Sequence, residues 1–320
     1  MNKEELLRCV REKSGKPSIK FPSEIDFQEN NHVITLTMWD SVAKNMQDDS
    51  AAFEGWALCL KASLDAEARK CCLKWKKPDD PEYPQYQRFL YRVDKFDSIF
   101  GGSNGWFFID DENKEFKADL QIKDNIRYYL NSPSTSDEER RNDKTKNKEN
   151  RLENEILGQQ DNLKGLAECC PVKLHRQLPV GLFHTKVREE NAIFPSKHSA
   201  IDLWGAKGDG LYILELKAKG NCKIGVLSEL FFYTMVLRDE QARIFTRESD
   251  EGKLIGNTKQ IKAFILAPEL HPFITQKVFV LLNEKSRNQK MEFGWIKFGY
   301  VETDPNLRFN SFERQYLECY

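Results

Sequence analysis

The sequence of 320 residues lacks the long apolar runs that mark a membrane protein. A membrane-spanning helix needs roughly 18 to 20 uninterrupted apolar residues. The best candidate, residues 224–237, is shorter than this and is interrupted by Glu229. The N-terminus also lacks the apolar segment of a signal peptide. We therefore expect a cytoplasmic protein that has no membrane partner.

An excess of charge of one sign is also missing. Lys and Arg number 49 and Asp and Glu number 50, which gives a formal net charge of −1 at pH 7. This balance excludes a protein that coats polyanions through bulk positive charge, although it allows a local basic groove. Hydrophobic residues make up 40% of the chain and charged residues 31%, which is typical of a globular protein rather than a disordered one.

Several common motifs are absent as well. The eight cysteines include two adjacent pairs but no Cys-x-x-Cys, the spacing that zinc ribbons and thioredoxin-like sites need. We expect reduced, buried thiols. The five histidines show no paired metal-binding spacing. There is no Walker loop, no G-x-S-x-G motif and no G-x-G-x-x-G motif after a predicted strand.

A polar stretch divides the chain. Residues 132–150 contain no large apolar residue and so cannot help to bury a core. We predict an α+β domain of unassigned role over 1–131, a polar linker over 132–150 and a second domain over 151–320. The first domain would bind substrate, a protein partner or a second copy of the chain. Its tryptophan-rich composition favours a core over a binding surface.

Apolar periodicity predicts alternating helices and strands, an α/β class. In the first half we predict helices over 51–66 and 86–100 and strands over 32–38, 71–76 and 106–109. In the second half we predict helices over 149–166, 224–238 and 272–283, and strands over 172–183, 200–204, 211–218, 261–267 and 292–302. From residue 149 the order is α-β-β-β-α-β, with additions at the C-terminal end.

Two of these strands, 200–204 and 211–218, flank a glycine-rich turn, which predicts a β-hairpin. Side chains alternate between the two faces along a strand. Glu215 and Lys217 therefore share one face of an otherwise apolar strand. A structural ion pair would explain them, but such pairs add little net stability because desolvation offsets the attraction. We favour a functional role.

The register of the hairpin relates these residues to a second acid. If Trp204 pairs with Leu211, Asp202 lies diagonal to Glu215, roughly 7 to 8 Å away at the backbone. Two carboxylates at that separation can bind one divalent cation, and oxygen ligands suit Mg²⁺ or Mn²⁺. Lys217 would lie beside the metal, where it can orient a water or stabilise charge on a phosphate.

Asp202, followed by Glu215-Leu216-Lys217 within the α-β-β-β-α-β order, resembles the PD-(D/E)XK nuclease superfamily, which has the restriction-endonuclease-like fold. The resemblance covers about residues 151–267 and leaves the first half unexplained. The residue before Asp202 is Ile201 rather than Pro, a departure from the motif. The resemblance implies a restriction-endonuclease-like core and Mg²⁺ or Mn²⁺ as the cofactor.

The resemblance also implies roles for single residues. Asp202 and Glu215 would be metal ligands, the Leu216 carbonyl a third ligand, and Lys217 the catalytic lysine. Members of the superfamily often place another carboxylate on the first core helix. Here Glu153 borders the apolar stripe of that helix and is preferred to Glu155, with a solvated helix charge as the alternative.

Further residues could complete the site. Glu229, on the apolar helix after the motif, would be an additional acid near the metal or a helix charge at the edge of the interface. Three residues just beyond the second hairpin strand, Lys219, Asn221 and Lys223, would contact a phosphate backbone, although surface lysines are common. Arg176 and Gln177 would approach substrate phosphates or bases, or would form a hydrogen-bonded pair at a strand edge.

The sequence therefore predicts a metal-dependent nuclease that hydrolyses phosphodiester bonds, with DNA as the expected substrate. The expected reaction is in-line attack of a metal-activated water. Restriction, anti-phage defence and repair are settings suggested by analogy alone. Two alternatives stay open: a catalytically inactive nuclease-fold module that binds nucleic acid or a protein partner, and a scaffold protein that never meets nucleic acid.

Overall fold

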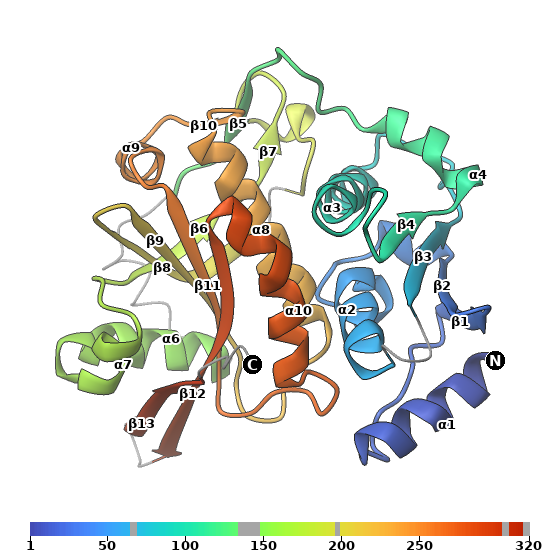
Figure 1. Cartoon of the computed structure of the whole chain (residues 1–320). Helices are drawn as coiled ribbons and strands as arrows, with labels where there is room; N and C mark the ends of the chain where they lie inside the picture. Colours follow the sequence, from blue (N-terminus) through green and yellow to red (C-terminus); the bar gives the residue numbers. More distant parts are fainter. Residues whose placement is uncertain (65–68, 134–147, 196–198, 303–306, 316–320) are drawn as a thin grey trace.

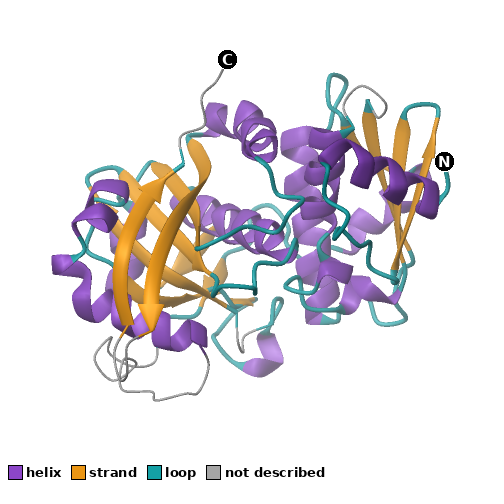
Figure 2. Cartoon of the chain, turned by 90° about the horizontal axis from the view of Figure 1, so that it is seen from below, coloured by secondary structure: helices purple, strands orange, loops and turns teal. Residues whose placement is uncertain are grey.

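The computed structural model places the secondary-structure elements in layers (Figures 1 and 2). A six-stranded sheet has helices on both faces, and a second group of helices separates it from a smaller sheet in the N-terminal half. The structure describes residues 1–64, 69–133, 148–195, 199–302 and 307–315. Most of the polar linker expected over 132–150 lies outside the described residues.

The six-stranded sheet has the order β13-β12-β11-β9-β8-β6. Three strands, β6, β8 and β9, form an antiparallel meander, whereas β9, β11 and β12 run parallel to one another and β13 is antiparallel to β12. Parallel neighbours need a crossover connection, which helices provide here. The strands are β6 (His175–Pro179), β8 (Ala200–Lys207), β9 (Gly210–Leu216), β11 (Gln260–Ala267), β12 (Met291–Glu302) and β13 (Leu307–Arg314).

Helices cover the two faces of this sheet with separate apolar cores. On one face, α6 (Lys148–Gln159) and α7 (Lys164–Cys169) pack against the even-numbered positions of β9, such as Leu214. On the other face, α8 (Gly225–Gln241) and α10 (Gln276–Ser286) pack against the odd-numbered positions, such as Ile213. The burial of β9 on both faces explains its nearly continuous apolar sequence.

The N-terminal half, residues 1–133, builds the smaller sheet, whose strand order is β1-β2-β3-β4. Its helices α2 and α3 lie between this sheet and the α8–α10 layer (Figure 1). The helices are α1 (Lys3–Ser14), α2 (Phe53–Ser63), α3 (Pro84–Phe100) and the short α4 (Asp111–Lys114). The strands are β1 (Ile25–Asn30), β2 (Val33–Met38), β3 (Lys70–Trp75) and β4 (Phe107–Ile109).

The two halves share one apolar core. Phe96 of α3 makes an edge-on contact with Phe231 of α8, with 5.4 Å between ring centroids. A third sheet also joins the halves, because β5 (Tyr128–Leu130) pairs with β10 (Phe245–Arg247) and with β7 (Leu182–Phe183). Helix α9 (Asp250–Gly256) follows β10. The N-terminal half is thus packed directly against the elements that follow the candidate motif.

The mixed α/β class expected from the sequence is confirmed, with two local corrections. The helix expected over 149–166 is broken by a 3₁₀ turn at Gln160–Asn162, where the Gln160 side chain accepts the Leu174 N–H (2.9 Å). The strand expected over 172–183 is two strands in different sheets, β6 (His175–Pro179) and β7 (Leu182–Phe183), with residues 180–181 between them. Among the described residues, no helix combines the length and apolar character needed to span a membrane.

Candidate active site

The hairpin of β8 and β9 carries the two expected metal ligands. The strands are joined by a two-residue turn in which Gly208 has a φ of +60°, a conformation that glycine adopts without strain. Trp204 pairs with Ile213. The expected pairing of Trp204 with Leu211 is therefore wrong by two residues, because the turn is shorter than the glycine-rich run suggested.

Asp202 consequently lies opposite Glu215 rather than diagonal to it. The ladder ends with Leu203 paired with Leu214, and one more step in this register brings Asp202 level with Glu215. At this point the Asp202 carboxylate (Oδ2) accepts the Leu216 N–H at 2.8 Å. The register therefore relates the two residues differently from the sequence prediction.

Lys217 connects Glu215 with an acid from the next helix. Its Nζ lies 2.7 Å from Glu215 Oε1 and 3.1 Å from Glu229 Oε2. The side chains of Glu215 and Glu229 are 3% and 1% exposed, and that of Lys217 is 12% exposed. Glu229 is therefore buried beside the lysine rather than at the edge of an interface.

The first core helix contributes a fourth acid. Glu153 is buried, accepts a hydrogen bond from Arg176 Nε at 2.6 Å and is hydrogen-bonded to Asp202. Glu155 points elsewhere and accepts from Gln159 (2.8 Å). The preference for Glu153 over Glu155 thus agrees with its position. Arg176, expected either near substrate phosphates or bases or in a hydrogen-bonded pair, is 2% exposed and paired with Glu153.

The other residues expected to contact substrate lie next to the cluster. Lys219, Asn221 and Lys223 are exposed on the loop between β9 and α8. Asn221 donates to Glu149 Oε1 of α6 (2.7 Å). Gln177 on β6 is half-buried, and its φ of +44° is unusual for a residue other than glycine.

Comparison with family models, with curated proteins and with solved structures gives no match for this chain. The function must therefore be argued from the chemistry of the site.

Acidic side chains outnumber cationic ones in the site. We name its four acids the acidic cluster: Glu153, Asp202, Glu215 and Glu229. Two cations, Arg176 and Lys217, form ion pairs with it. Burial, and secondly the charge of Glu153, raise the pKa of Asp202 to about 8. A proton on Asp202 also explains how two carboxyl groups can share a hydrogen bond.

The flanking groups have shifted pKa values for related reasons. Burial, reinforced by the charges of Asp202 and Glu229, raises the pKa of Glu215 well above its usual range. Burial alone would lower the pKa of Lys217, but the charges of Glu215, Glu229 and Asp202 outweigh it and raise that pKa. Lys217 is therefore an ammonium ion, and the acids repel one another when no further cation is bound.

The donor set has the chemistry that a hard divalent cation requires. Glu215 Oε2 is buried and has no hydrogen-bond partner within the described residues, and an unsatisfied carboxylate oxygen is costly to bury. Asp202 lies opposite it, and carboxylate oxygens suit Mg²⁺ or Mn²⁺. Over the same residues, no three His, Cys, Asp or Glu side chains are grouped as a ready-made metal site. Lys217 Nζ already occupies Glu215 Oε1.

Sequence reasoning missed two residues of this region. Gln47, from the segment after β2, donates from Nε2 to Glu229 Oε1 at 2.6 Å. Tyr233 is buried one turn after Glu229 on α8, and its pKa is raised by burial and then by the charges of Glu215 and Glu229. Period 3.6 on α8 could have indicated Tyr233. No pattern in the sequence indicates Gln47.

A separate cleft of about 1010 Å³ lies at the C-terminal end of α8. Its walls come from α3, β10, α9 and the segment before β5. They include Lys95, which is paired with Asp239 of α8 at 2.8 Å, and the cation Arg243. None of the acidic-cluster residues lines this cleft. It is therefore distinct from the candidate active site.

Proposed function

We propose that this chain is a metal-dependent nuclease of the PD-(D/E)XK kind and that it hydrolyses phosphodiester bonds in DNA. The observation that carries the proposal is the buried Glu215 Oε2, which has no hydrogen-bond partner within the described residues and belongs to a carboxylate that the ammonium of Lys217 contacts through Oε1. A site that buries four carboxyl groups beside two cations and leaves one carboxylate oxygen unsatisfied is suited to bind a further cation, which would displace protons from the acids.

The topology around the site supports the same proposal. The order α6-β6-β8-β9-α8-β11, with a meander of β6, β8 and β9 and with β11 parallel to β9, corresponds to the α-β-β-β-α-β core that the superfamily has. Asp202 and Glu215 come from β8 and β9, the two strands of the hairpin. The exposed lysines Lys219 and Lys223 follow on the adjoining loop, where a phosphate backbone would contact them.

Each protein group then has a defined task. Asp202 and Glu215 would hold Mg²⁺ or Mn²⁺, which neutralises phosphate charge and lowers the pKa of water when bound. Lys217 places a positive charge beside the position of the scissile phosphate and stabilises the negative charge that increases there during in-line attack. In the reaction, water adds to phosphorus, the P–O bond to the leaving oxygen breaks, and that oxygen takes up a proton.

One observation favours the alternative of a non-cleaving nucleic-acid-binding module. Lys217 bridges Glu215 and Glu229, so part of the negative charge is already compensated without a metal. In such a module the ion pair of Lys217 with Glu229 would only hold the end of β9 to α8. The two functions differ in whether a metal ion binds at Glu215.

The test combines DNA cleavage with metal binding. We expect wild-type protein to cleave single- or double-stranded DNA with Mg²⁺ or Mn²⁺, to lose activity in EDTA and to fail with Ca²⁺, which prefers more ligands and looser geometry. Glu215→Gln should abolish cleavage and weaken metal binding measured by calorimetry. The matched control is Glu155→Gln on α6, whose side chain bonds only Gln159 in the described chain. Cleavage in excess chelator, or equal activity in both variants, would contradict the proposal.

A further inference from the structure

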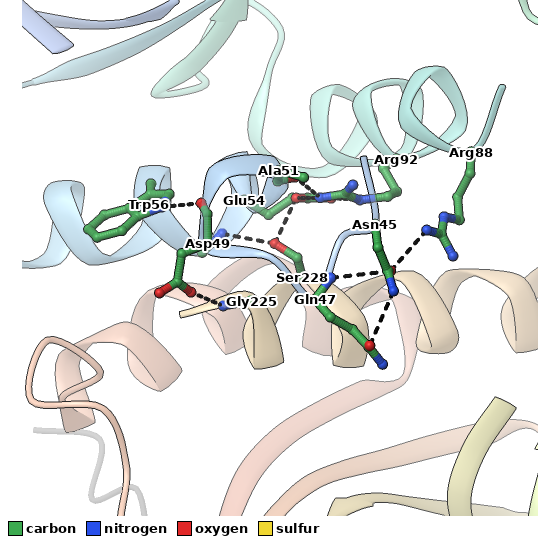
Figure 3. Close-up of polar contacts among 11 residues, drawn as sticks. Asn45, Gln47, Asp49, Ala51, Glu54, Trp56, Arg88, Arg92, Gly225 and Ser228 are labelled. Carbon is green, nitrogen blue, oxygen red and sulfur yellow. Dashed lines mark hydrogen bonds and ion pairs between the residues drawn. The ribbon is translucent and has the colours of Figure 1, made fainter. Parts of the chain in front are cut away.

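A segment of the N-terminal half reaches the candidate active site. Residues 45–49 lie across the start of α8 (Figure 3). The Asp49 carboxylate accepts the Gly225 N–H at 3.1 Å, and an acid at this end of a helix is favourable because unpaired N–H groups point at it. A Cβ on Gly225 would lie 2.5 Å from the Gln47 carbonyl oxygen. The absence of a side chain at Gly225 therefore permits this close approach.

A chain of hydrogen bonds runs from this segment to the catalytic lysine. Arg88 Nη2 donates to Asn45 Oδ1 (3.1 Å), and Asn45 Nδ2 donates to Gln47 Oε1 (3.2 Å), as Figure 3 shows. Gln47 Nε2 then donates to Glu229 Oε1 (2.6 Å). Glu229 Oε2 contacts Lys217 Nζ at 3.1 Å.

The order of donors and acceptors fixes how Gln47 is oriented. Because Asn45 donates to the carbonyl end of the Gln47 amide, the NH₂ end faces Glu229. Glu229 is 1% exposed, so its carboxylate depends on protein donors such as Gln47. Gln47 itself is exposed, which places it at the border between the buried cluster and solvent.

We infer that Gln47 is a positioning residue of the candidate active site and that the N-terminal half completes that site. Gln47 holds one oxygen of Glu229, so that the other oxygen fixes the Lys217 ammonium beside Glu215. Asn45 acts through Gln47, and Arg88 acts through Asn45. The inference deepens the proposed nuclease function and rests on it for the identity of the reaction.

The first test separates positioning from folding. Gln47→Ala should lower the single-turnover cleavage rate at saturating enzyme by about 10- to 100-fold, the usual effect of losing a group that orients a catalytic residue. DNA affinity and the unfolding midpoint should stay at wild-type values. The matched control is Asp48→Ala, an exposed neighbour whose side chain has no partner among the described residues. It should cleave at the wild-type rate.

The hydrogen bond from Asn45 to Gln47 suggests a second variant. Asn45→Ala should lower the rate less than Gln47→Ala, and the double variant should be no slower than Gln47→Ala alone, since both act through one contact. If the losses of cleavage rate in the two single variants multiplied in the double variant, Asn45 would not act through Gln47.

A readout without cleavage distinguishes this inference from the function itself. Amine-reactive labelling followed by mass spectrometry measures the reactivity of each lysine. Gln47→Ala should raise labelling of Lys217 several-fold, whereas labelling of the exposed Lys219 should stay constant. If wild-type protein cleaves nothing but Lys217 labelling still rises, the nuclease proposal fails and the positioning role stands. If wild-type protein cleaves and Gln47→Ala matches it in rate and in labelling, the positioning role is overturned.

Discussion

The carboxylate of Asp202 accepts the Leu216 N–H at 2.8 Å, just beyond the last backbone pair of the β8–β9 ladder. The Asp202 side chain thus accepts a backbone N–H of β9 at a level where main-chain pairing between the two strands has ended. This contact and the charge of Lys217 favour the carboxylate form of Asp202, whereas burial and the charges of Glu153 and Glu229 disfavour it. The balance of these effects predicts how stability depends on pH.

Asp202→Asn should stabilise the protein at pH 8 but not at pH 4. Burial and the charge of Glu153 raise the pKa of Asp202 to about 8, whereas an aspartate in an unfolded chain has a pKa of about 3.9. Between these values the folded state binds a proton that the unfolded state does not. The contribution of Asp202 to stability is therefore full below pH 4 and is lost as the pH rises through 8.

Asparagine removes this loss and can still accept the Leu216 N–H. We expect a gain of about 1–2 kcal/mol at pH 8, smaller than the full shift implies because buried groups relax when they ionise. Urea denaturation without divalent metal, at both pH values and relative to wild type, measures it. A variant that is less stable than wild type at pH 8 would show that the Asp202 charge is favourable in the fold.

Much of the fold followed from local pattern. Period-two spacing predicted that Glu215 and Lys217 share a face, and the 2.7 Å contact between them agrees. The strand β1 was missed although Ile25 and Phe27 alternate with polar residues, because the turn that pairs it with β2 uses Asn31 and His32, both with positive φ, instead of glycine. A turn without glycine gives only a weak signal in a sequence.

The rest of the site depends on contacts between distant segments. The register of the hairpin depended on turn length, an error of two residues that moved Asp202 from diagonal to opposite Glu215. Gln47 and Glu229 are 182 residues apart, and no periodicity relates them. Tertiary packing of the N-terminal half on α8 brings them together, and a sequence pattern carries no information on such packing.

Lys217→Ala should lower turnover far more than DNA affinity. Lys217 contacts Glu215 and lies beside the proposed metal, so its interaction with phosphate should strengthen in the transition state. The exposed Lys219 and Lys223 should show the opposite profile, with weaker binding, a shallower salt dependence and nearly unchanged single-turnover rates. Single-turnover cleavage and salt-dependent binding of the three alanine variants check this. A wild-type rate for saturated Lys217→Ala would exclude a catalytic lysine.

Two glycines on helices near the site should respond in opposite directions to alanine. At Gly225 the added Cβ would meet the Gln47 carbonyl at 2.5 Å and the Met46 carbonyl at 3.0 Å, so residues 46–47 must move. We expect a loss of about 1–3 kcal/mol and slower cleavage. At Gly158 on α6 nothing lies within 4 Å, and alanine should add about 0.5–1 kcal/mol with no change in rate. Thermal unfolding and cleavage of both variants test this contrast, and equal effects would refute it.

Arg92→Leu should strongly destabilise the contact between the N-terminal half and α8. Arg92 of α3 donates to both carboxylate oxygens of Glu54 on α2, and Ser228 of α8 donates to the same carboxylate at 2.8 Å. Glu54 is fully buried and Arg92 is 2% exposed, so loss of the guanidinium leaves an uncompensated charge in the core. Such a loss costs about 3–5 kcal/mol.

Replacing both partners with apolar residues should remove most of this penalty. We expect Glu54→Leu combined with Arg92→Met to recover the greater part of the lost stability, because no charge is then left buried without its partner. The control is Lys253→Met, which breaks an exposed ion pair with Asp250 and should have no measurable effect. Urea denaturation followed by tryptophan fluorescence compares the three variants with wild type. Because the halves share one core, we expect each to unfold in a single transition. A double variant as unstable as Arg92→Leu would show that the charged pair itself, rather than relief of a buried charge, holds the halves together.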